Sequence, residues 1–209
     1  MRTRALIGAT ALAAVVAGLA LLTTSRPAEA GETWKANSNY SIKEAQTFQQ
    51  FGVYYAGDSV LDLPLTVVHR KPVTGFGPTA NAQDAIYFLY GFCNLPEGDG
   101  GCAPPVQVIN EPACIYNPSL YEGQGPFGPV PDETQIRGVP AAFFEHGERL
   151  EIQTATSTVV VYGPNENAVR AVADALESLN VNPRVPAGGP LPQPAPGAIE
   201  GTLPCNKPF

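Results

Sequence analysis

Basic side chains are scarce in this sequence. It has 12 lysine and arginine residues against 19 aspartate and glutamate residues, and its formal net charge is −7. Nucleic acids and anionic membrane surfaces are bound through basic patches, so we expect neither as a partner. Only residues 5–22 are apolar over a length that could cross a bilayer, so a membrane is expected to be contacted through this segment alone, if at all.

Several motifs that carry chemistry are also missing. The sequence has no Cys-x-x-Cys, and its cysteine spacings of 9, 12 and 91 residues do not match those of zinc sites. It has neither a Gly-x-Ser-x-Gly nor a Ser-x-x-Lys motif. We therefore assign no catalytic residue, no cofactor and no metal ligand, although a triad assembled in space would leave no trace in the sequence.

Residues 1–30 have the features of a secretory signal peptide. Arg2 and Arg4 precede the apolar run, and Ala28 and Ala30 are small residues at the positions that signal peptidase reads. The apolar run is about 18 residues long, so an uncleaved membrane anchor is the alternative. We predict a secreted or cell-surface bacterial protein that is cleaved before Gly31.

Cleavage would make the net charge of the chain more negative. It would remove Arg2, Arg4, Arg26 and Glu29, so the formal net charge would go from −7 to −9. The remainder is predicted to hold one domain over residues 31–182, with lobes at about 41–121 and 133–182. The Pro-rich residues 183–209 form an extended tail.

The four cysteines indicate two disulfide bonds, because an even number in an exported chain is typical of disulfide pairing. The sequence leaves all three connectivities open. We predict a short loop closed by Cys93 and Cys102, and a bond between Cys114 and Cys205 that holds the tail on the domain.

Two helices are predicted. A capping box of Ser41 and Glu44 begins one that runs through residue 51 and ends at Gly52. The second covers about residues 166–180, where apolar residues recur at spacings of three and four, with Asn165 or Asn167 as its cap. Strands are predicted at residues 53–56, 63–70, 85–90, 106–109, 135–138, 141–144, 149–154 and 158–162, with a loop over 110–131.

This pattern predicts an α+β fold. A mainly antiparallel sheet is expected to be covered on one face by both helices and to be completed by disulfide-stabilised loops.

Each residue that is a candidate for catalysis or ion binding also has an ordinary structural explanation. His146 lies among carboxylates, but a polar hairpin tip accounts for it. His69 with Arg70 and Lys71 is a candidate anion site, or a solvated strand end. Glu97 and Asp99 are too few for a full calcium site, and an ordinary turn explains them better.

Two further features also have an ordinary structural explanation. The helix start after residues 163–165 is a candidate anion site, for which plain capping is the simpler explanation. The aromatic pairs offer a binding surface of which at most half is exposed, because adjacent strand residues face opposite ways: Tyr54, Tyr55, Phe143 and Phe144.

One stretch resembles a known motif. The residues that carry the similarity are Phe88-Leu89-Tyr90-Gly91-Phe92-Cys93, Gly101-Cys102-Ala103-Pro104-Pro105-Val106-Gln107-Val108 and Cys114, with residues 53–57 and 63–65 before them. They are similar to a motif of uncharacterised secreted bacterial proteins. The resemblance covers about residues 48–121 and implies secretion without implying an activity. Residues 135–179 resemble, more weakly, small strand–strand–strand–helix domains of unknown function.

The sequence therefore favours a non-catalytic binding domain of the bacterial envelope or exterior, which recognises a protein or a small molecule. The alternative is a secreted hydrolase whose site is assembled in space.

Overall fold

A computed structural model describes residues 38–74, 82–92, 103–116 and 132–205. Contacts along the chain divide it into two units, Met1–Gly31 and Glu32–Phe209, and the described residues all belong to the second. The predicted signal peptide, the pair Cys93 and Cys102, and the candidates Glu97 and Asp99 lie outside the described residues.

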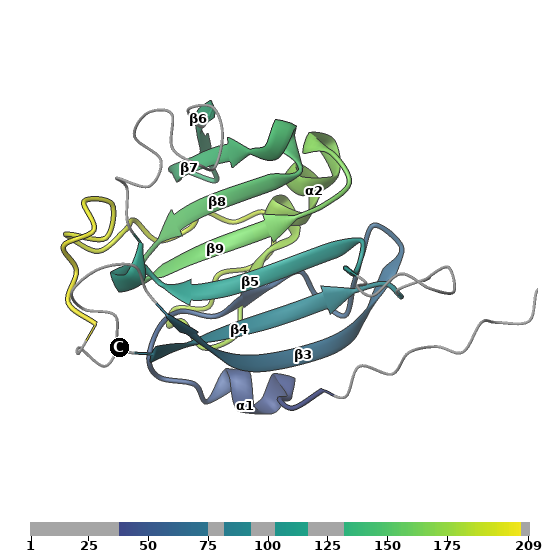
Figure 1. The fold of residues 1–209 in the computed structure, drawn as a ribbon, viewed down its shortest axis with the longest axis horizontal. Coiled ribbons are helices and arrows are strands. Elements are labelled where there is room, and N and C mark those ends of the chain that lie inside the picture. The colour runs from purple at the N-terminus through teal and green to yellow at the C-terminus, as the bar shows by residue number, and fades with distance from the viewer. Residues whose placement is uncertain (1–37, 75–81, 93–102, 117–131, 206–209) are drawn as a thin grey trace, which may run out of the picture. The chain divides into compact units, whose positions relative to one another are not determined.

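One curled antiparallel sheet of eight strands forms the framework (Figure 1). Its strands, in spatial order, are β2 (Ser59–Val60), β3 (Leu63–Thr74), β4 (Ala82–Tyr90), β5 (Val106–Pro112), β9 (Ser157–Tyr162), β8 (Arg149–Thr154), β7 (Val139–Phe144) and β6 (Asp132–Ile136).

The pairing of β5 with β9 joins the two halves of the sequence into this one sheet. Val108 lies opposite Val161, and Asn110 lies opposite Val159. The strands of the first predicted lobe, β2 to β5, and those of the second, β6 to β9, are therefore halves of a continuous layer. The antiparallel sheet that the alternating and apolar runs predict is confirmed.

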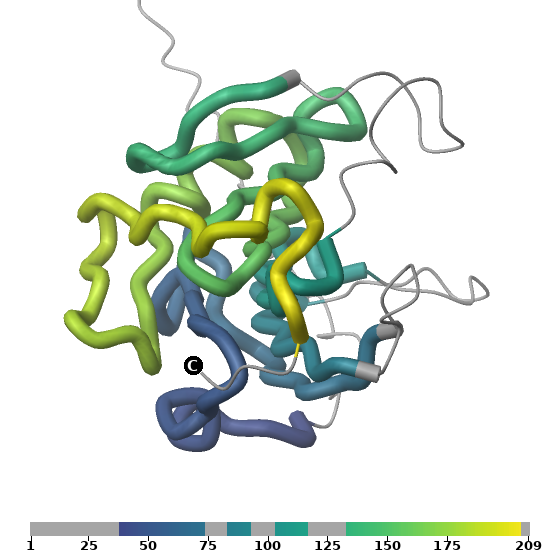
Figure 2. Tube along the Cα trace, turned by 90° about the vertical axis from the view of Figure 1, so that its left-hand side faces the viewer, coloured from purple at the N-terminus to yellow at the C-terminus, as the bar shows by residue number. Residues whose placement is uncertain are grey.

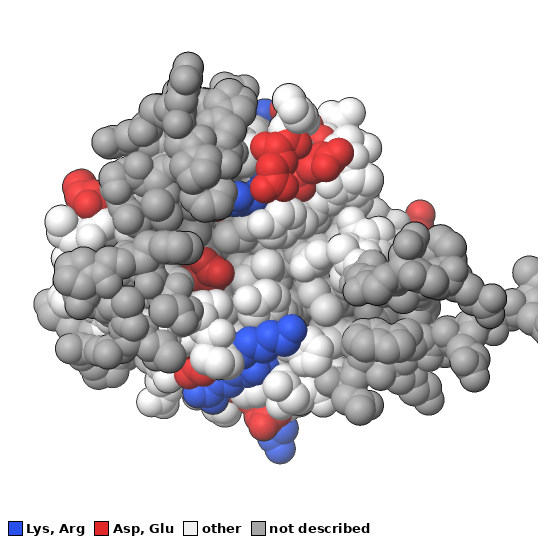
Figure 3. Space-filling model, in the orientation of Figure 1, with Lys and Arg blue, Asp and Glu red and all other residues white. Residues whose placement is uncertain are grey.

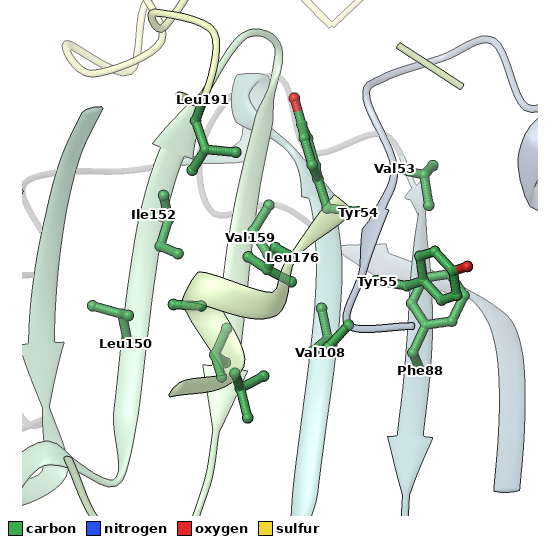
Figure 4. Packing of buried hydrophobic residues seen from close by; sticks show 14 of the residues in the cluster. Val53, Tyr54, Tyr55, Phe88, Val108, Leu150, Ile152, Val159, Leu176 and Leu191 are labelled. Atoms are coloured by element: carbon green, nitrogen blue, oxygen red, sulfur yellow. The ribbon is translucent and has the colours of Figure 1, made fainter. Parts of the chain in front are cut away.

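The inner face of the sheet carries the core. Alternate residues of its strands are fully buried, among them Phe88, Val108, Val159 and Ile152 (Figure 4). Helix α2 (Glu166–Ala175) contacts β8 and β9 and adds Val169 and its neighbours to the same cluster. This burial supplies most of the favourable free energy of such a fold.

A two-stranded ladder of β1 (Tyr54–Tyr55) and β10 (Glu177–Ser178) is separate from the large sheet. The side chain of Asn110 in β5 accepts a hydrogen bond from the Tyr54 N–H at 2.7 Å and donates one to the Tyr54 carbonyl at 2.8 Å. Asn180 accepts from the Val53 N–H and donates to the carbonyls of Phe48 and Phe51. The side-chain amides of Asn110 and Asn180 therefore make hydrogen bonds with the backbone of this segment that a neighbouring strand would otherwise make.

Helix α2 is shorter than the prediction of residues 166–180. Asn165 caps its start, since its side chain accepts from the Ala168 N–H at 3.0 Å. The helix ends at Ala175, because Leu176 turns to an extended conformation (φ −58°, ψ 130°) and the next two residues pair with β1. The predicted helix was too long because Leu176 continues the apolar period of the helix. Its side chain is buried although its backbone is extended.

The first helix, α1 (Ile42–Gln46), is also shorter than predicted. The predicted capping box is present, with the Glu44 N–H donating to Ser41 Oγ at 3.2 Å. The helix ends five residues before the predicted end, and the Thr47 hydroxyl donates a hydrogen bond to the Glu44 carbonyl there. Phe48 and Phe51 pack edge to face beyond it.

Two short 3-10 helices follow strands in the part of the chain that the structure describes. The predicted loop over 110–131 is wrong at its start, because β5 continues to Pro112 and η1 (Ala113–Ile115) follows. The predicted hairpin between β7 and β8 is confirmed, with η3 (Glu145–Gly147) at its tip.

The C-terminal tail lies against the domain (Figure 2). Cys114 and Cys205 form a disulfide bond, which confirms that half of the predicted pairing. Leu191 and Ala198 are buried, and the Leu191 and Ala195 N–H groups donate to the carbonyls of Arg137 and Ala155. The tail is therefore a structural part of the domain.

The described residues form a mainly antiparallel α+β fold with few helices. The contacts do not confirm the prediction that two helices cover one face of the sheet. No helix within the described ranges is long and apolar enough to cross a membrane.

Candidate functional site

The outer face of the sheet is the side opposite the core. Figure 1 shows α2 behind β8 and β9, so this outer face is turned toward the viewer. Strand register aligns its side chains in rows that cross the sheet. One row runs through His69, Tyr87, Ile109, Val160 and Glu151.

A second row runs beside the first. It contains Glu111, Thr158 and Gln153 on β5, β9 and β8, and Lys71 and Ala85 on β3 and β4. Thr158 and Gln153 are buried and share a hydrogen bond of 2.9 Å. Glu111 is half-buried at the end of β5. The face therefore combines carboxyl groups, amides, a hydroxyl and aromatic rings.

Cations lie over the aromatic rings of this face. The Lys71 ammonium is 5.4 Å from the centre of the Tyr87 ring. The Arg149 guanidinium is 4.7 Å from the Phe144 ring and 6.0 Å from the Tyr162 ring. Burial raises the pKa of both tyrosines, with a smaller contribution from the Glu111 charge. Tyr87 and Tyr162 are therefore neutral rings that attract positive charge.

Glu111 has the most perturbed carboxyl group of the outer face. Burial, and to a smaller extent the Glu151 charge, raise its pKa to about 7 against the opposing effect of the Arg149 charge. Within the described ranges, no side chain hydrogen-bonds or ion-pairs with its carboxyl group. Such a group in a partly buried setting is typical of functional sites.

Arg149 is engaged by two carboxyl groups. It forms ion pairs with Glu151 and, at 3.2 Å, with Glu145. Glu151 is buried, so this pair compensates a charge that would be costly alone. The charge of Arg149 is therefore already neutralised within the protein.

Charge is unevenly distributed over this view of the molecule. In Figure 3 acidic side chains gather over β7 and β8 and basic ones over β3 and β4, with a mainly uncharged surface between them. Among the described residues of the outer face, the acidic groups Glu111, Glu133 and Glu151 outnumber the basic groups Lys71 and Arg149. His69 adds little positive charge, because burial and Lys71 lower its pKa.

The candidate anion site at His69, Arg70 and Lys71 is not assembled. Arg70 forms an ion pair with Asp84 at 2.6 Å, and Lys71 lies over Tyr87. The His69 Nδ1 atom is 3.2 Å from the Asn39 Oδ1 atom. Strand alternation separates Arg70 from its two neighbours, which is the reason that three consecutive basic residues make no common site.

His146 is exposed at the tip of the β7–β8 hairpin, with a left-handed backbone (φ 57°). Its neighbour Glu145 pairs with Arg149, and no contact between the His146 imidazole and a carboxylate is among the interactions of the described residues. The helix start after residues 163–165 is capped by Asn165, and Arg170 is engaged with Glu166.

The aromatic pairs are more buried than expected. Tyr54 and Tyr55 are both buried, because β1 lies between the large sheet and β10 instead of at a solvated edge. Phe143 is buried and Phe144 is half-buried on the outer face, as alternation predicts. Within the described part of the chain, no three His, Cys, Asp or Glu side chains are grouped as metal ligands would be.

Sequence reasoning missed Glu111, because residues 110–131 were read as loop. The sequence carries only part of the signal: Val106, Gln107 and Val108 alternate, but Ile109 and Asn110 break the apolar period, and the unbroken alternation of buried and half-buried positions over Val106–Pro112 is seen only in the structure. Extending the strand by three residues would have placed Glu111 beside Gln107 and Ile109 on one face.

Comparison of the chain with protein-family models, with curated proteins and with solved structures found no match. The fold therefore defines the class only as a mainly antiparallel, disulfide-bonded α+β protein. Any function must be inferred from the site itself.

Proposed function

We propose that this chain is a non-catalytic binding domain of the bacterial envelope or exterior, and that its ligand, a protein or a small molecule, binds to the outer face of the sheet. The observation that carries the proposal is Glu111. Its carboxyl group is half-buried near Tyr87 and Ile109, and no described side chain pairs with it. Half-buried aromatic and apolar groups with a few polar groups among them are typical of binding surfaces.

The proposed location rests on two features. Residues 1–30 have the pattern of a signal peptide, and the Cys114–Cys205 bond is compatible with an oxidising compartment. An N-terminal membrane anchor is the alternative to cleavage.

The test compares retention of envelope and culture-medium components by the immobilised protein. The double variant Tyr87→Ala/Glu111→Gln removes the proposed contacts, and Glu200→Gln removes one exposed charge in the tail as a matched control. We expect a component that the wild-type protein and the control retain and the double variant loses. Equal retention by all three proteins would contradict a binding role for this face.

A second function, a secreted hydrolase, is favoured by one observation. A carboxyl group with a pKa of about 7 suits general acid–base catalysis near neutral pH, and Glu151 supplies a second carboxylate on the same face. A panel of ester, peptide and glycoside substrates tests it. Turnover that is lost in Glu111→Gln and kept in His146→Ala would support the hydrolase, and no turnover by the wild-type protein would exclude it for those substrates.

A further inference from the structure

We infer that the outer face binds a basic segment of a partner protein, with a lysine or arginine side chain placed over the Tyr87 ring and beside the Glu111 carboxylate. This inference rests on the function proposed above and names the chemistry of the ligand. Four features of the described residues support it.

The first is charge complementarity. Glu111, Glu133 and Glu151 face outward from β5, β6 and β8, and only Glu151 has its charge matched by Arg149. The whole chain is also acidic, with a formal net charge of −7. A cationic partner is therefore attracted at long range and meets an unpaired carboxylate at the surface.

The second is the contact between Lys71 and Tyr87. The Lys71 side chain is exposed, yet its ammonium lies 5.4 Å from the centre of the Tyr87 ring. The protein thus already places an ammonium group on this ring. An incoming lysine can make the same contact, with the advantage that it also approaches Glu111.

The third is the apolar surface beside these groups. Ile109 lies opposite Tyr87, and Leu89 is two positions along β4 on the same face, both half-buried. Ala85 lies on β4 between Lys71 and the β5 end that carries Glu111, and it is fully buried. Lysine and arginine have long apolar stems that pack on such surfaces while the charged ends remain outside.

The fourth is the length of the face. The two rows named above are buried where they cross β9 and β8, but a neighbouring row is half-buried along its length: Leu89, Gln107, Tyr162 and Arg149. From β4 to β8 it crosses four strands, which at about 4.8 Å per strand spacing is roughly 14 Å. An extended peptide of about four residues covers that distance at about 3.3 Å per residue. A polypeptide segment therefore matches the face better than a single small amine does.

The experiment is a titration of fluorescent hexalysine into the disulfide-bonded protein at pH 8, with hexaserine as the neutral control peptide. Two matched pairs of variants separate a local site from general attraction. Glu111→Gln is compared with Glu200→Gln, which removes the same charge in the tail. Lys71→Ala is compared with Lys43→Ala, which removes the same charge from an exposed position of α1.

We expect Glu111→Gln to weaken hexalysine binding about ten-fold and Glu200→Gln by less than about two-fold. Lys71→Ala is expected to tighten binding about three-fold, because it frees the Tyr87 ring and removes a competing cation, whereas Lys43→Ala is expected to change it by less than about two-fold. Circular dichroism at the same pH checks that each variant is folded. Tyr87→Leu removes the aromatic ring and is also expected to weaken hexalysine binding.

Three results would overturn the inference: no hexalysine binding by the wild-type protein, equal effects within either matched pair, or equal binding of hexaserine. If hexalysine fails while the double variant Tyr87→Ala/Glu111→Gln still loses an envelope component, the proposed binding face stands and only its basic ligand is wrong. If both experiments fail, the binding function fails with them.

Discussion

The guanidinium group of Arg137 donates a hydrogen bond of 2.5 Å to the carbonyl oxygen of Leu176, the residue that follows the last turn of α2. Arg137 also donates to the carbonyls of Ala173, Pro186 and Gly189. It lies in the turn between β6 and β7 with a left-handed backbone (φ 50°). One side chain therefore connects a hairpin turn, the end of a helix and the start of the tail.

The first prediction concerns this side chain. Arg137→Ala removes four hydrogen bonds, including those to the Ala173 and Leu176 carbonyls at the end of α2, so it should lower the free energy of unfolding by about 3 kcal/mol. Chemical denaturation measures the change. Arg184→Ala is the control, because Arg184 is exposed and forms only a surface ion pair of 3.2 Å with Glu177. The control should change stability by less than about 1 kcal/mol, and equal effects would show that Arg137 has no special role.

The second prediction concerns Asn110, whose buried amide holds both polar groups of the Tyr54 backbone. Asn110→Ala leaves a buried N–H and a buried carbonyl without this partner, so it should cost about 2–4 kcal/mol. Asn167→Ala, on the exposed side of α2, should cost less than about 1 kcal/mol. Faster amide hydrogen exchange at Tyr54 in Asn110→Ala alone would locate the effect; unchanged exchange there would contradict it.

The sequence predicts the main sheet well, because its strands are long alternating or apolar runs whose period is read directly. It predicts element ends less well. Helix α2 ends where Arg137, 39 residues earlier in the chain, takes the Leu176 carbonyl and where β10 pairs with β1. Neither partner is adjacent in sequence, so no local pattern contains the signal.

The candidate site could be predicted only in part. The aromatic and charged residues were visible, but the outer face exists only because the register brings β4, β5, β9 and β8 side by side. The pairing of β5 with β9 joins residues about 50 apart in the chain. Glu111 is recognised as a candidate site residue only when this pairing places Glu151 and Arg149 near it.

The third prediction concerns pH. The pKa of Glu111 rises from 4.5 to about 7 on folding, so between these values the folded state holds a proton that the unfolded state releases. This contribution to stability is complete below pH 4.5, falls as pH rises, and is lost above pH 7. Its size is at most about 3 kcal/mol. Thermal unfolding from pH 4.5 to 8 should show the decline in the wild-type protein and lack it in Glu111→Gln.

The difference between these two proteins is the quantity to measure, because other groups titrate as well. The pKa of His69 is lowered by burial, so its contribution rises with pH toward 6.5 and opposes that of Glu111. Arg70 lowers the pKa of Asp84, whose contribution is lost as pH falls below 3.8 and lies outside the window. A wild-type minus Glu111→Gln difference that stays constant with pH would contradict the assignment.

The fourth prediction compares the two cysteine pairs. Cys114 and Cys205 are 91 residues apart, so their bond restricts the unfolded chain over a long loop, and Cys114→Ser/Cys205→Ser should cost about 2–5 kcal/mol. The predicted bond between Cys93 and Cys102 would close a much shorter loop, so Cys93→Ser/Cys102→Ser should cost about 2 kcal/mol less. Limited proteolysis should cut residues 183–205 faster in the first variant only. A tail equally resistant in both would show that its packing suffices without the bond.

The fifth prediction concerns export. The intact mass of the protein from its producing cells should correspond to a chain that starts at Gly31, with no alkylation before reduction and four alkylated thiols after it. A mass that retains residues 1–30 would favour the membrane anchor instead. Free thiols in the native sample would contradict the second disulfide.

The pairing of β5 with β9 has a consequence for how the molecule is made. Strands β2 to β5 are complete once residue 112 has been synthesised, but the neighbour of β5 is not made until residues 157–162. During that interval β5 has an unpaired edge, and its buried positions Val106 and Val108 lack the strand that will cover their flank. Exposed edges of this kind pair with other chains. Until β9 has been synthesised, this edge of β5 is therefore a place where two growing chains can pair.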